Sequence, residues 1–254
     1  MKKVAYIVEP RKHGALKFVL ANFDSQLPAE YSLQIFYSEI NKQFVYDIID
    51  SLNLTRNVIL CNLGVTSFTH EDESNMVRTV EFWEKIDGDI ALKFECDTIL
   101  CPQSKFSLNQ FEQYKYIGGY WGTQLYELDQ QYPRLKPGGD YSTPYNGPQI
   151  LPMNGGLSLR HKKSMIYCIE TYLDEYIKSG KPYSEDYFYS EYLPKPTTRQ
   201  VIQFSIDNGY IMPLDNELPF GLHKPWANKG NVYTTLKTLC PELETLKQLQ
   251  YNYE

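Results

Sequence analysis

The stretch Lys93-Phe94-Glu95-Cys96-Asp97-Thr98-Ile99 decides the fold, because an apolar run, Ile90–Phe94, leads into it and two carboxylates follow at once. Side chains alternate between the two faces of an extended strand, so we expect Glu95 and Asp97 on one side and Cys96 on the other. Carboxylate oxygens suit Mg²⁺ and Mn²⁺, which keep open positions for water and for substrate phosphates. The pair therefore predicts a cation site that faces a diphosphate. The alternative is a strand end with solvated acidic side chains.

The segments that precede this stretch alternate between strand and helix patterns. The predicted strands are Val4–Val8, Ser32–Tyr37, Asn57–Leu63 and Ile90–Phe94, and the predicted helices are His13–Asn22, Lys42–Leu52 and Glu71–Ile86. This alternation predicts an α/β fold in a single domain, with a mixed, mostly parallel central sheet and helices on both of its faces. Ligands bind such sheets beyond the carboxyl ends of the strands, where Glu95 and Asp97 lie.

The chain changes character after this half. Five prolines and three glycines between Glu127 and Met153 predict a long loop. An apolar stripe along Lys162–Lys178, ended by Gly180, predicts a core helix. Pro241–Tyr251 has the pattern of a final amphipathic helix.

Composition restricts the classes of function. The 254 residues are 42% hydrophobic and carry a formal net charge of −6, which is typical of a globular protein and disfavours a nucleic-acid partner. The amino-terminal apolar run is too short for a signal peptide or a membrane span, so we expect a cytoplasmic protein. The five scattered cysteines have no CxxC spacing, so we expect reduced thiols, with neither a disulfide framework nor a zinc site.

Four further segments follow one another in a specific order. They are Val8-Glu9-Pro10-Arg11, Met153-Asn154-Gly155-Gly156-Leu157-Ser158-Leu159-Arg160, Ser184-Glu185-Asp186-Tyr187 and Pro219-Phe220-Gly221-Leu222-His223-Lys224-Pro225-Trp226. With these segments the sequence resembles the GT-A-fold glycosyltransferases, and most closely a little-characterised glycosyltransferase-like domain family with NGG-S-R, ED and HK-W segments. The resemblance runs from about Val4 to Trp226. It implies a nucleotide-binding part over about residues 1–101, an acceptor-binding part over about 102–230 and a C-terminal helix over about 231–254.

The resemblance also implies a metal site. Glu95 and Asp97 take the place of the DxD-type motif that binds Mn²⁺ or Mg²⁺ against the diphosphate of a nucleotide-sugar, with UDP as the commonest carrier. The first position is Glu in place of Asp, so Asp97 is the stronger candidate ligand. His223 falls where many proteins of this fold supply a late metal ligand, and neutral imidazole suits Mn²⁺. A packed, hydrogen-bonded histidine is the alternative for His223.

Further residues are implied in donor binding. They are Val8, Glu9, Arg11, Asn75, Arg78, Cys96, Asn154, Gly155, Gly156, Ser158 and Lys224. Paired glycines let a backbone approach a ligand closely, although a tight turn explains them equally well. Asn75 and Arg78 lie one turn apart on a predicted helix, where ordinary surface polarity is the alternative. Lys224 can neutralise a phosphate or can be a surface lysine.

Asp186, with Glu185 as the second candidate, falls where inverting members of the fold place their catalytic base, which takes the proton of the acceptor hydroxyl. Ser184-Glu185-Asp186 is also a favourable helix start. The resemblance thus implies a metal-dependent hexosyl- or pentosyltransferase acting on a nucleotide-sugar and on a glycan or other hydroxyl acceptor. Two rivals are a sugar nucleotidyltransferase, which normally needs more glycines than residues 9–14 contain, and a non-catalytic carbohydrate-binding protein.

Overall fold

The structure is a computed structural model that describes residues 1–121, 153–181, 184–208, 217–227 and 231–250. The loop predicted between Glu127 and Met153 lies outside the described residues, apart from Met153 itself. No helix in the described part combines the length and the apolar character that a membrane crossing needs.

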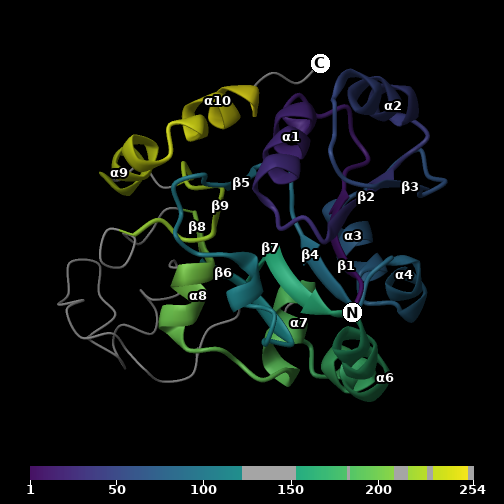
Figure 1. Cartoon of the computed structure of the whole chain (residues 1–254). Coiled ribbons are helices and arrows are strands. Elements are labelled where there is room, and N and C mark those ends of the chain that lie inside the picture. The colour runs from purple at the N-terminus through teal and green to yellow at the C-terminus, as the bar shows by residue number, and fades with distance from the viewer. Residues whose placement is uncertain (122–152, 182–183, 209–216, 228–230, 251–254) are drawn as a thin grey trace.

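A mixed sheet forms the centre of the molecule, and its nine described strands have the order β3-β2-β1-β4-β7-β6-β8-β9-β5 (Figure 1). The strands are β1 (Lys3–Val8), β2 (Tyr31–Tyr37), β3 (Val58–Asn62), β4 (Ile90–Lys93), β5 (Thr98–Leu100), β6 (Tyr116–Trp121), β7 (Asn154–His161), β8 (Ser205–Asp207) and β9 (Gly221–His223). The pairings β1–β2, β2–β3, β1–β4, β6–β8 and β8–β9 are parallel, whereas β4–β7, β6–β7 and β5–β9 are antiparallel. The predicted mixed, mostly parallel sheet is therefore confirmed.

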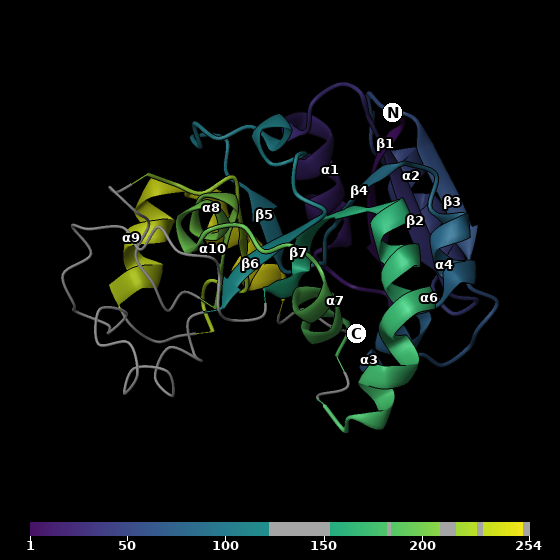
Figure 2. The same ribbon diagram turned by 90° about the horizontal axis from the view of Figure 1, so that it is seen from below.

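Helices cover both faces of this sheet. They are α1 (Leu16–Gln26), α2 (Lys42–Ser51), α3 (His70–Met76), α4 (Val80–Lys85), α6 (Lys162–Lys178), α7 (Glu185–Tyr192), α8 (Thr198–Phe204), α9 (Asn231–Leu239) and α10 (Glu242–Leu249), with a short 3₁₀ turn at Leu108–Gln110. The connections through α1 and α2 lead outward from β1 to β3, and α3 and α4 lead back to β4. Connections between parallel strands are right-handed, and these connections run in opposite directions along the sheet. Helices α1 and α2 therefore lie on one face, and α3 and α4 lie on the other. From below, α6 and α7 lie near β7, where the sheet changes from parallel to antiparallel pairing (Figure 2).

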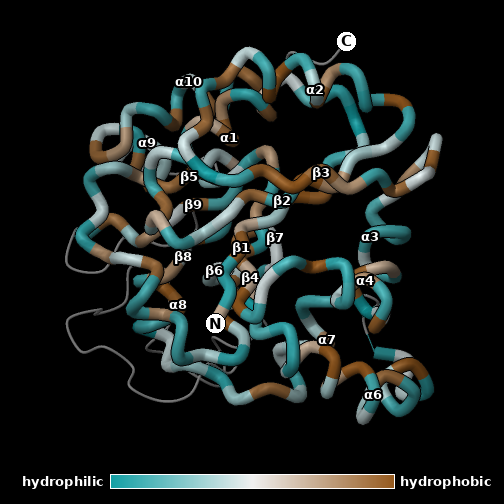
Figure 3. The backbone as a smooth tube through the Cα atoms, turned by 45° about the vertical axis from the view of Figure 1, so that its right-hand side comes forward, coloured by the Kyte–Doolittle hydropathy of each residue, from teal (hydrophilic) through white to brown (hydrophobic). Residues whose placement is uncertain are grey.

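The hydrophobic core follows from this arrangement. Five of the six residues of β1 are buried, as expected for a strand covered on both faces. Figure 3 shows hydrophobic residues along the central strands and mixed hydropathy around α6. Trp83 of α4 is fully buried, and its indole Nε1 donates to the Val77 carbonyl and to the Tyr189 hydroxyl. These bonds connect α4 to α7 through the core.

The helix predicted over Glu71–Ile86 is wrong in one respect, because the structure divides it into α3 and α4. Thr79 begins α4 as its N-cap, and its side chain accepts a hydrogen bond from Phe82 N. A side chain that caps a new helix satisfies amide groups that a continuous helix would satisfy through its backbone. The apolar spacing continues across the break, so periodicity alone did not reveal it.

The expectation of reduced thiols is also wrong for one pair, because Cys101 and Cys240 form a disulfide. The two cysteines are 139 residues apart, so no local spacing pointed to the pairing. Cys101 follows β5 and Cys240 follows α9, and the bond thus fixes the C-terminal helices beside β5. Gln250, at the end of α10, adds a hydrogen bond from Nε2 to the Cys96 carbonyl at 2.8 Å.

Candidate active site

The carboxyl end of β4 and the ends of β8 and β9 meet at one place. The chain leaves β4 at Lys93 and turns through Glu95-Cys96-Asp97, so these three residues lie in a turn and not in the strand expected from alternation. The Thr98 hydroxyl and amide both donate to the Glu95 carbonyl, at 2.6 and 3.1 Å, and close this turn. The strand register then pairs Thr98 with His223. Asp97 consequently lies beside the His223 ring.

Glu95, Asp97 and His223 form the cluster that a cation site requires. One ligand atom from each lies within 4.8 Å of the others. His223 Nε2 is 3.1 Å from Asp97 Oδ1 and 3.4 Å from Glu95 Oε2. Asp97 Oδ1 and His223 Nε2 are buried, and neither makes a well-aligned hydrogen bond within the described residues. Buried polar atoms of this kind are rare in proteins, and a divalent cation would satisfy both. The two carboxylates and the imidazole thus fit Mn²⁺ or Mg²⁺, with the imidazole favouring Mn²⁺.

The charges in the cluster are strongly coupled. Burial alone would raise the pKa of Asp97, but His223 outweighs it and holds that pKa below its ordinary value. Burial likewise opposes the charge of Glu95, but Lys93 and His223 keep the pKa of Glu95 well below its usual range. Burial disfavours the imidazolium, yet Asp97 and Asp207 raise the pKa of His223 well above normal. Positive charge at this place is therefore strongly stabilised.

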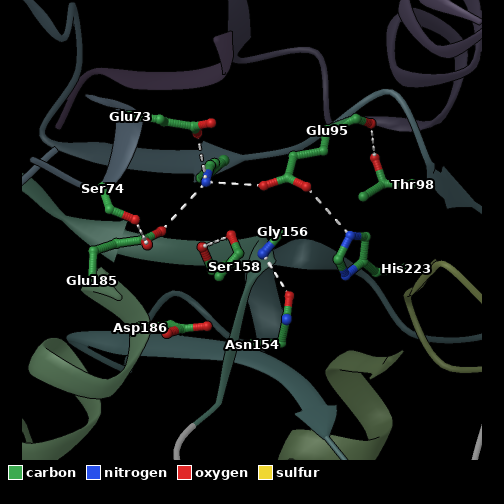
Figure 4. A network of polar contacts seen from close by, with 12 residues as sticks. Glu73, Ser74, Glu95, Thr98, Asn154, Gly156, Ser158, Glu185, Asp186 and His223 are labelled. Atoms are coloured by element: carbon green, nitrogen blue, oxygen red, sulfur yellow. Dashed lines mark hydrogen bonds and ion pairs between the residues drawn. The ribbon is translucent and has the colours of Figure 1, made fainter. Parts of the chain in front are cut away.

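Lys93 connects the cluster to the neighbouring elements. Its ammonium group is 2.8 Å from Glu73 Oε1, 3.0 Å from Glu95 Oε1 and 3.3 Å from Glu185 Oε1, and the residue is only 3% exposed. Figure 4 shows the three carboxylates converging from different elements, with the second Glu95 oxygen directed toward His223. One oxygen of Glu95 is therefore held by Lys93 while the other remains beside the imidazole.

Glu185 is held as a buried anion. It lies at the start of α7, is 5% exposed, and accepts from the Arg160 guanidinium at 3.1 Å as well as from Lys93. Burial would raise its pKa, but Lys93 and Arg160 bring the pKa down to about 2. The Ser158 hydroxyl accepts from Arg160 Nε at 2.8 Å and donates to the Gly155 carbonyl at 2.9 Å. Glu185 and Ser158 are thus parts of an internal network around Arg160.

Asp186 is the adjacent carboxylate and has a different environment. Its Oδ1 accepts from the Tyr187 amide at 2.8 Å and from the Ser184 hydroxyl. Burial and the neighbouring Glu185 charge raise the pKa of Asp186 to about 6. A carboxylate with a pKa near neutrality that faces a cavity has the properties of a general base.

Two adjoining cavities contain these groups. The first, about 310 Å³, is lined by Val8, Glu9, Arg11, Glu95, Cys96, Asp97 and Lys224 among the predicted residues. The second, about 320 Å³, is lined by Glu95, Asn154, Gly155, Gly156, Glu185, Asp186, His223 and Lys224 among them. Glu95 and Lys224 line both cavities. Within the first cavity, both carboxylate oxygens of Glu9 accept from the Arg11 guanidinium at 2.8 Å.

Three predicted residues do not line either cavity. Asn75 is exposed on α3, and Arg78 is 4% exposed and donates to the Ser74 carbonyl at 2.9 Å and to Asn75 Oδ1 at 3.0 Å. Ser158 is fully buried in the Arg160 network. The same helix contributes His70 and Glu73 instead, and both line the two cavities. Sequence reasoning missed these residues, as it missed Lys93 and Asp207, although the spacing of His70 and Glu73 by one helical turn was a usable signal.

Gly155 and Gly156 lie within strand β7, so the turn alternative for this pair is wrong. A Cβ on Gly156 would lie 2.4 Å from Cε1 of the His223 ring, and a Cβ on Gly155 would lie 2.7 Å from Glu185 Oε1. Neither glycine is among the residues with positive φ. The pair therefore provides space for the imidazole and for the Glu185 carboxylate.

Lys224 directly follows His223 and has a positive φ of 45°, which is unfavourable for residues other than glycine. Its amide donates to the Asp97 carbonyl at 3.1 Å, and its ammonium group is 3.1 Å from Asp97 Oδ2. Strained backbone of this kind persists where the surroundings impose it and is common at functional sites. The strained backbone places the positively charged ammonium group of Lys224 at the boundary of the two cavities.

A family model described as protein of unknown function (DUF5672) matches residues 62–223, from the end of β3 through His223. The chain belongs to this family. The matched segment contains all the residues of the candidate site except Lys224 and the residues at and just after the end of β1. No curated protein matches the chain.

Solved structures of glycosyltransferases are similar to the chain over nearly all of its length. The galactosyltransferase LgtC, in complex with donor and acceptor sugar analogues, has a TM-score of 0.60 at 12% identity, over 99% of this chain and 97% of that one. GlyE from Streptococcus pneumoniae TIGR4, in its apo form, has a TM-score of 0.53 at 12% identity, over 99% of this chain and 65% of the GlyE chain. Mouse xyloside xylosyltransferase 1 has a TM-score of 0.53 at 8% identity, over 91% and 98%. At these identities the similarity shows the fold, and the GT-A-like fold implied by the sequence is confirmed.

Proposed function

We propose that this protein is a metal-dependent glycosyltransferase that moves a hexosyl or pentosyl group from a nucleotide-sugar, with UDP as the carrier, to a hydroxyl of a glycan or similar acceptor. One observation carries the proposal. Glu95, Asp97 and His223 form a buried ligand cluster at the boundary of two cavities, in a fold shared with glycosyltransferases, and a carboxylate with a raised pKa lines the second cavity.

The first cavity has the chemistry of a donor site. It opens beyond the carboxyl ends of β1 and β4, where ligands bind in parallel sheets. Bound Mn²⁺ or Mg²⁺ would be held by Glu95, Asp97 and His223 and would neutralise the departing diphosphate, an effect of several kcal/mol in metal enzymes. Lys224 supplies a further positive charge next to Asp97. Val8, Glu9 and Arg11 line the same cavity and would contact the nucleoside.

In the second cavity Asp186 accepts the proton of the acceptor hydroxyl, while Glu185 holds Arg160 and Lys93. A positioned base contributes about 10²–10⁴-fold to the rate of such reactions. We assign the base to Asp186 and not to Glu185, because the ion pairs of Glu185 hold its pKa near 2. A base facing the acceptor corresponds to inversion at the anomeric carbon.

The division into a nucleotide-binding part over about residues 1–101, an acceptor-binding part over about 102–230 and a C-terminal helix over about 231–254 remains a prediction. Lys224, within the range assigned to the acceptor, lines the first cavity as well as the second, and His223 lines the second. A cytoplasmic location also remains a prediction, and the Cys101–Cys240 disulfide speaks against it, because such bonds are typical of oxidising compartments.

The test is consumption of UDP-, GDP- and CMP-sugars by the pure protein, measured as released nucleotide with and without Mn²⁺. We expect Mn²⁺-dependent turnover of a UDP-sugar that falls at least about 100-fold in Asp97→Asn, because donor binding and leaving-group stabilisation both depend on this residue. Asp47→Asn, which removes the same charge from an exposed position on α2, is the matched control and should leave turnover unchanged. Equal turnover by Asp97→Asn and the wild type would refute the assignment of Asp97 as a metal ligand.

The same assays distinguish the two rival functions. Binding of a nucleotide-sugar without turnover would indicate a non-catalytic carbohydrate-binding protein, and pyrophosphate release from a nucleoside triphosphate would indicate a nucleotidyltransferase.

A further inference from the structure

Asp207, at the end of β8, is fully buried beside His223, and neither the sequence motifs nor the fold relationship draws attention to it. Its Oδ1 lies 2.8 Å from His223 Nδ1, on the side of the ring opposite the nitrogen that faces Asp97 and Glu95. Both atoms are buried, and neither makes a well-aligned hydrogen bond within the described residues, so the contact is an ion pair in this structure. The other oxygen, Oδ2, accepts from the Asn208 side-chain amide at 3.1 Å. The carboxylate is therefore held from one side and directed at the imidazole with the other oxygen.

The backbone around this contact is also constrained. β8 and β9 are parallel, and their register places Asp207 opposite His223. Asn208 follows with a positive φ of 57°, and its amide donates to the His223 carbonyl at 3.0 Å. Among the described residues, Asn208 and Lys224 are the two non-glycine residues with positive φ, and each directly follows one member of the Asp207–His223 pair. Asparagine adopts this conformation readily, whereas Lys224 is strained, so the backbone that follows His223 is held in a fixed geometry.

Asp207 is not a member of the cation cluster itself. The group whose ligand atoms approach within 4.8 Å comprises Glu95, Asp97 and His223. We propose that Asp207 is a positioning residue that holds His223 with Nδ1–H toward its own carboxylate, so that Nε2 presents its lone pair to the cation. This inference rests on the metal site of the proposed function. A carboxylate that accepts from the second nitrogen fixes the tautomer and the ring orientation of a metal-binding histidine.

The packing of the ring supports the same role. Gly156 of β7 leaves so little space that a Cβ would lie 2.4–2.8 Å from three atoms of the His223 ring. The β7 backbone thus restricts rotation of the ring from one face, and Asp207 restricts it through Nδ1. The two constraints together leave Nε2 directed toward Asp97.

The test compares Mn²⁺ affinity, measured from the electron paramagnetic resonance signal of free Mn²⁺, for the wild type and Asp207→Asn without any nucleotide-sugar. Loss of such an outer carboxylate typically lowers metal affinity about 10–100-fold, and we expect a loss in this range. Asp24→Asn is the matched control, since Asp24 is a buried aspartate paired at 3.0 Å with Arg56 away from the site. It should leave Mn²⁺ affinity unchanged in the folded protein.

A second readout separates positioning from a merely structural role. In the Mg²⁺-loaded wild type, ¹⁵N NMR should show His223 protonated at Nδ1, and Asp207→Asn should lose this preference. If Asp207→Asn does not fold, Asn208→Gly replaces it as the test variant. Glycine keeps the positive φ but removes the side-chain amide that donates to Asp207. The Mn²⁺ affinity of Asn208→Gly should lie measurably below that of the wild type. Unchanged affinity in Asp207→Asn, or in Asn208→Gly where the first variant is unfolded, would overturn the positioning role. A wild type without Mn²⁺ affinity would instead overturn the metal site of the proposed function.

Discussion

Asp186→Asn should stabilise the protein at neutral pH while it slows sugar transfer about 10²–10⁴-fold. Burial and the nearby Glu185 charge raise the pKa of Asp186 from 3.8 to about 6. A tenfold change in proton affinity corresponds to about 1.4 kcal/mol, so ionised Asp186 reduces the free energy of unfolding by about 3 kcal/mol. Asparagine keeps an oxygen that can accept from the Tyr187 amide and from the Ser184 hydroxyl, and it carries no charge.

The sign of the effect follows from the direction of the pKa change. The folded state binds the Asp186 proton more tightly than the unfolded state, so this group lowers stability progressively as pH rises from about 4 to about 6. The advantage of Asp186→Asn over the wild type should therefore be small near pH 4 and reach about 3 kcal/mol near pH 7. Wild-type turnover should increase with pH through about 6, as the base loses its proton.

Urea denaturation of both proteins at a series of pH values measures the difference directly. Asp174→Asn, at an exposed position on α6, is the control and should show no comparable gain. A stability difference that does not change between pH 4 and pH 7 would refute the buried, ionised state of Asp186. Full activity in Asp186→Asn would refute its role as the base.

Three further substitutions test other parts of the structure. Gly156→Ala should displace the His223 ring, because the new Cβ would lie 2.4 Å from ring carbon Cε1. Mn²⁺ affinity measured by titration should then fall at least about tenfold. Unchanged affinity would mean that the His223 ring is not needed for metal binding at this position. Lys93→Met should lower the free energy of unfolding by about 3–5 kcal/mol in urea denaturation, since three carboxylates lose their shared counter-charge, and a change below about 1 kcal/mol would contradict the network. Cys101→Ser should lower the free energy of unfolding by about 2–5 kcal/mol, because it removes the disulfide to Cys240. Dithiothreitol should lower the free energy of unfolding of the wild type to the same level and leave the variant unaffected. Equal stability of the wild type with and without the reductant would contradict the disulfide.

The order of the elements followed from local patterns. The strand predicted at Val4–Val8 is β1 at Lys3–Val8, and the helix predicted at Lys162–Lys178 is α6 with the same bounds. Such segments bury one face or both faces against neighbouring elements, so the spacing of their hydrophobic residues is visible in the sequence. The split between α3 and α4 was not visible, because a cap at Thr79 interrupts the backbone without interrupting the apolar spacing.

Glu95 and Asp97 were predictable because they directly follow the predicted buried strand Ile90–Phe94. The groups that determine their properties were not, because they come from distant segments. Lys93 is a single charged residue in an apolar strand, and only the folded chain brings it to Glu73 and Glu185. Asp207 stands in no motif, and its contact with His223 depends on the β8–β9 register. Long-range pairing of this kind leaves no signal in local spacing.

The central claim is that Glu95, Asp97 and His223 hold one divalent cation. Pulsed electron paramagnetic resonance of Mn²⁺ bound to ¹⁵N-labelled protein tests it most directly, because a nitrogen bonded to the ion gives a resolved hyperfine coupling. We expect coupling to one histidine nitrogen, which is absent in His223→Gln, and a large loss of Mn²⁺ affinity in Asp97→Asn. Bound Mn²⁺ without any nitrogen coupling, together with unchanged affinity in Asp97→Asn, would contradict the claim.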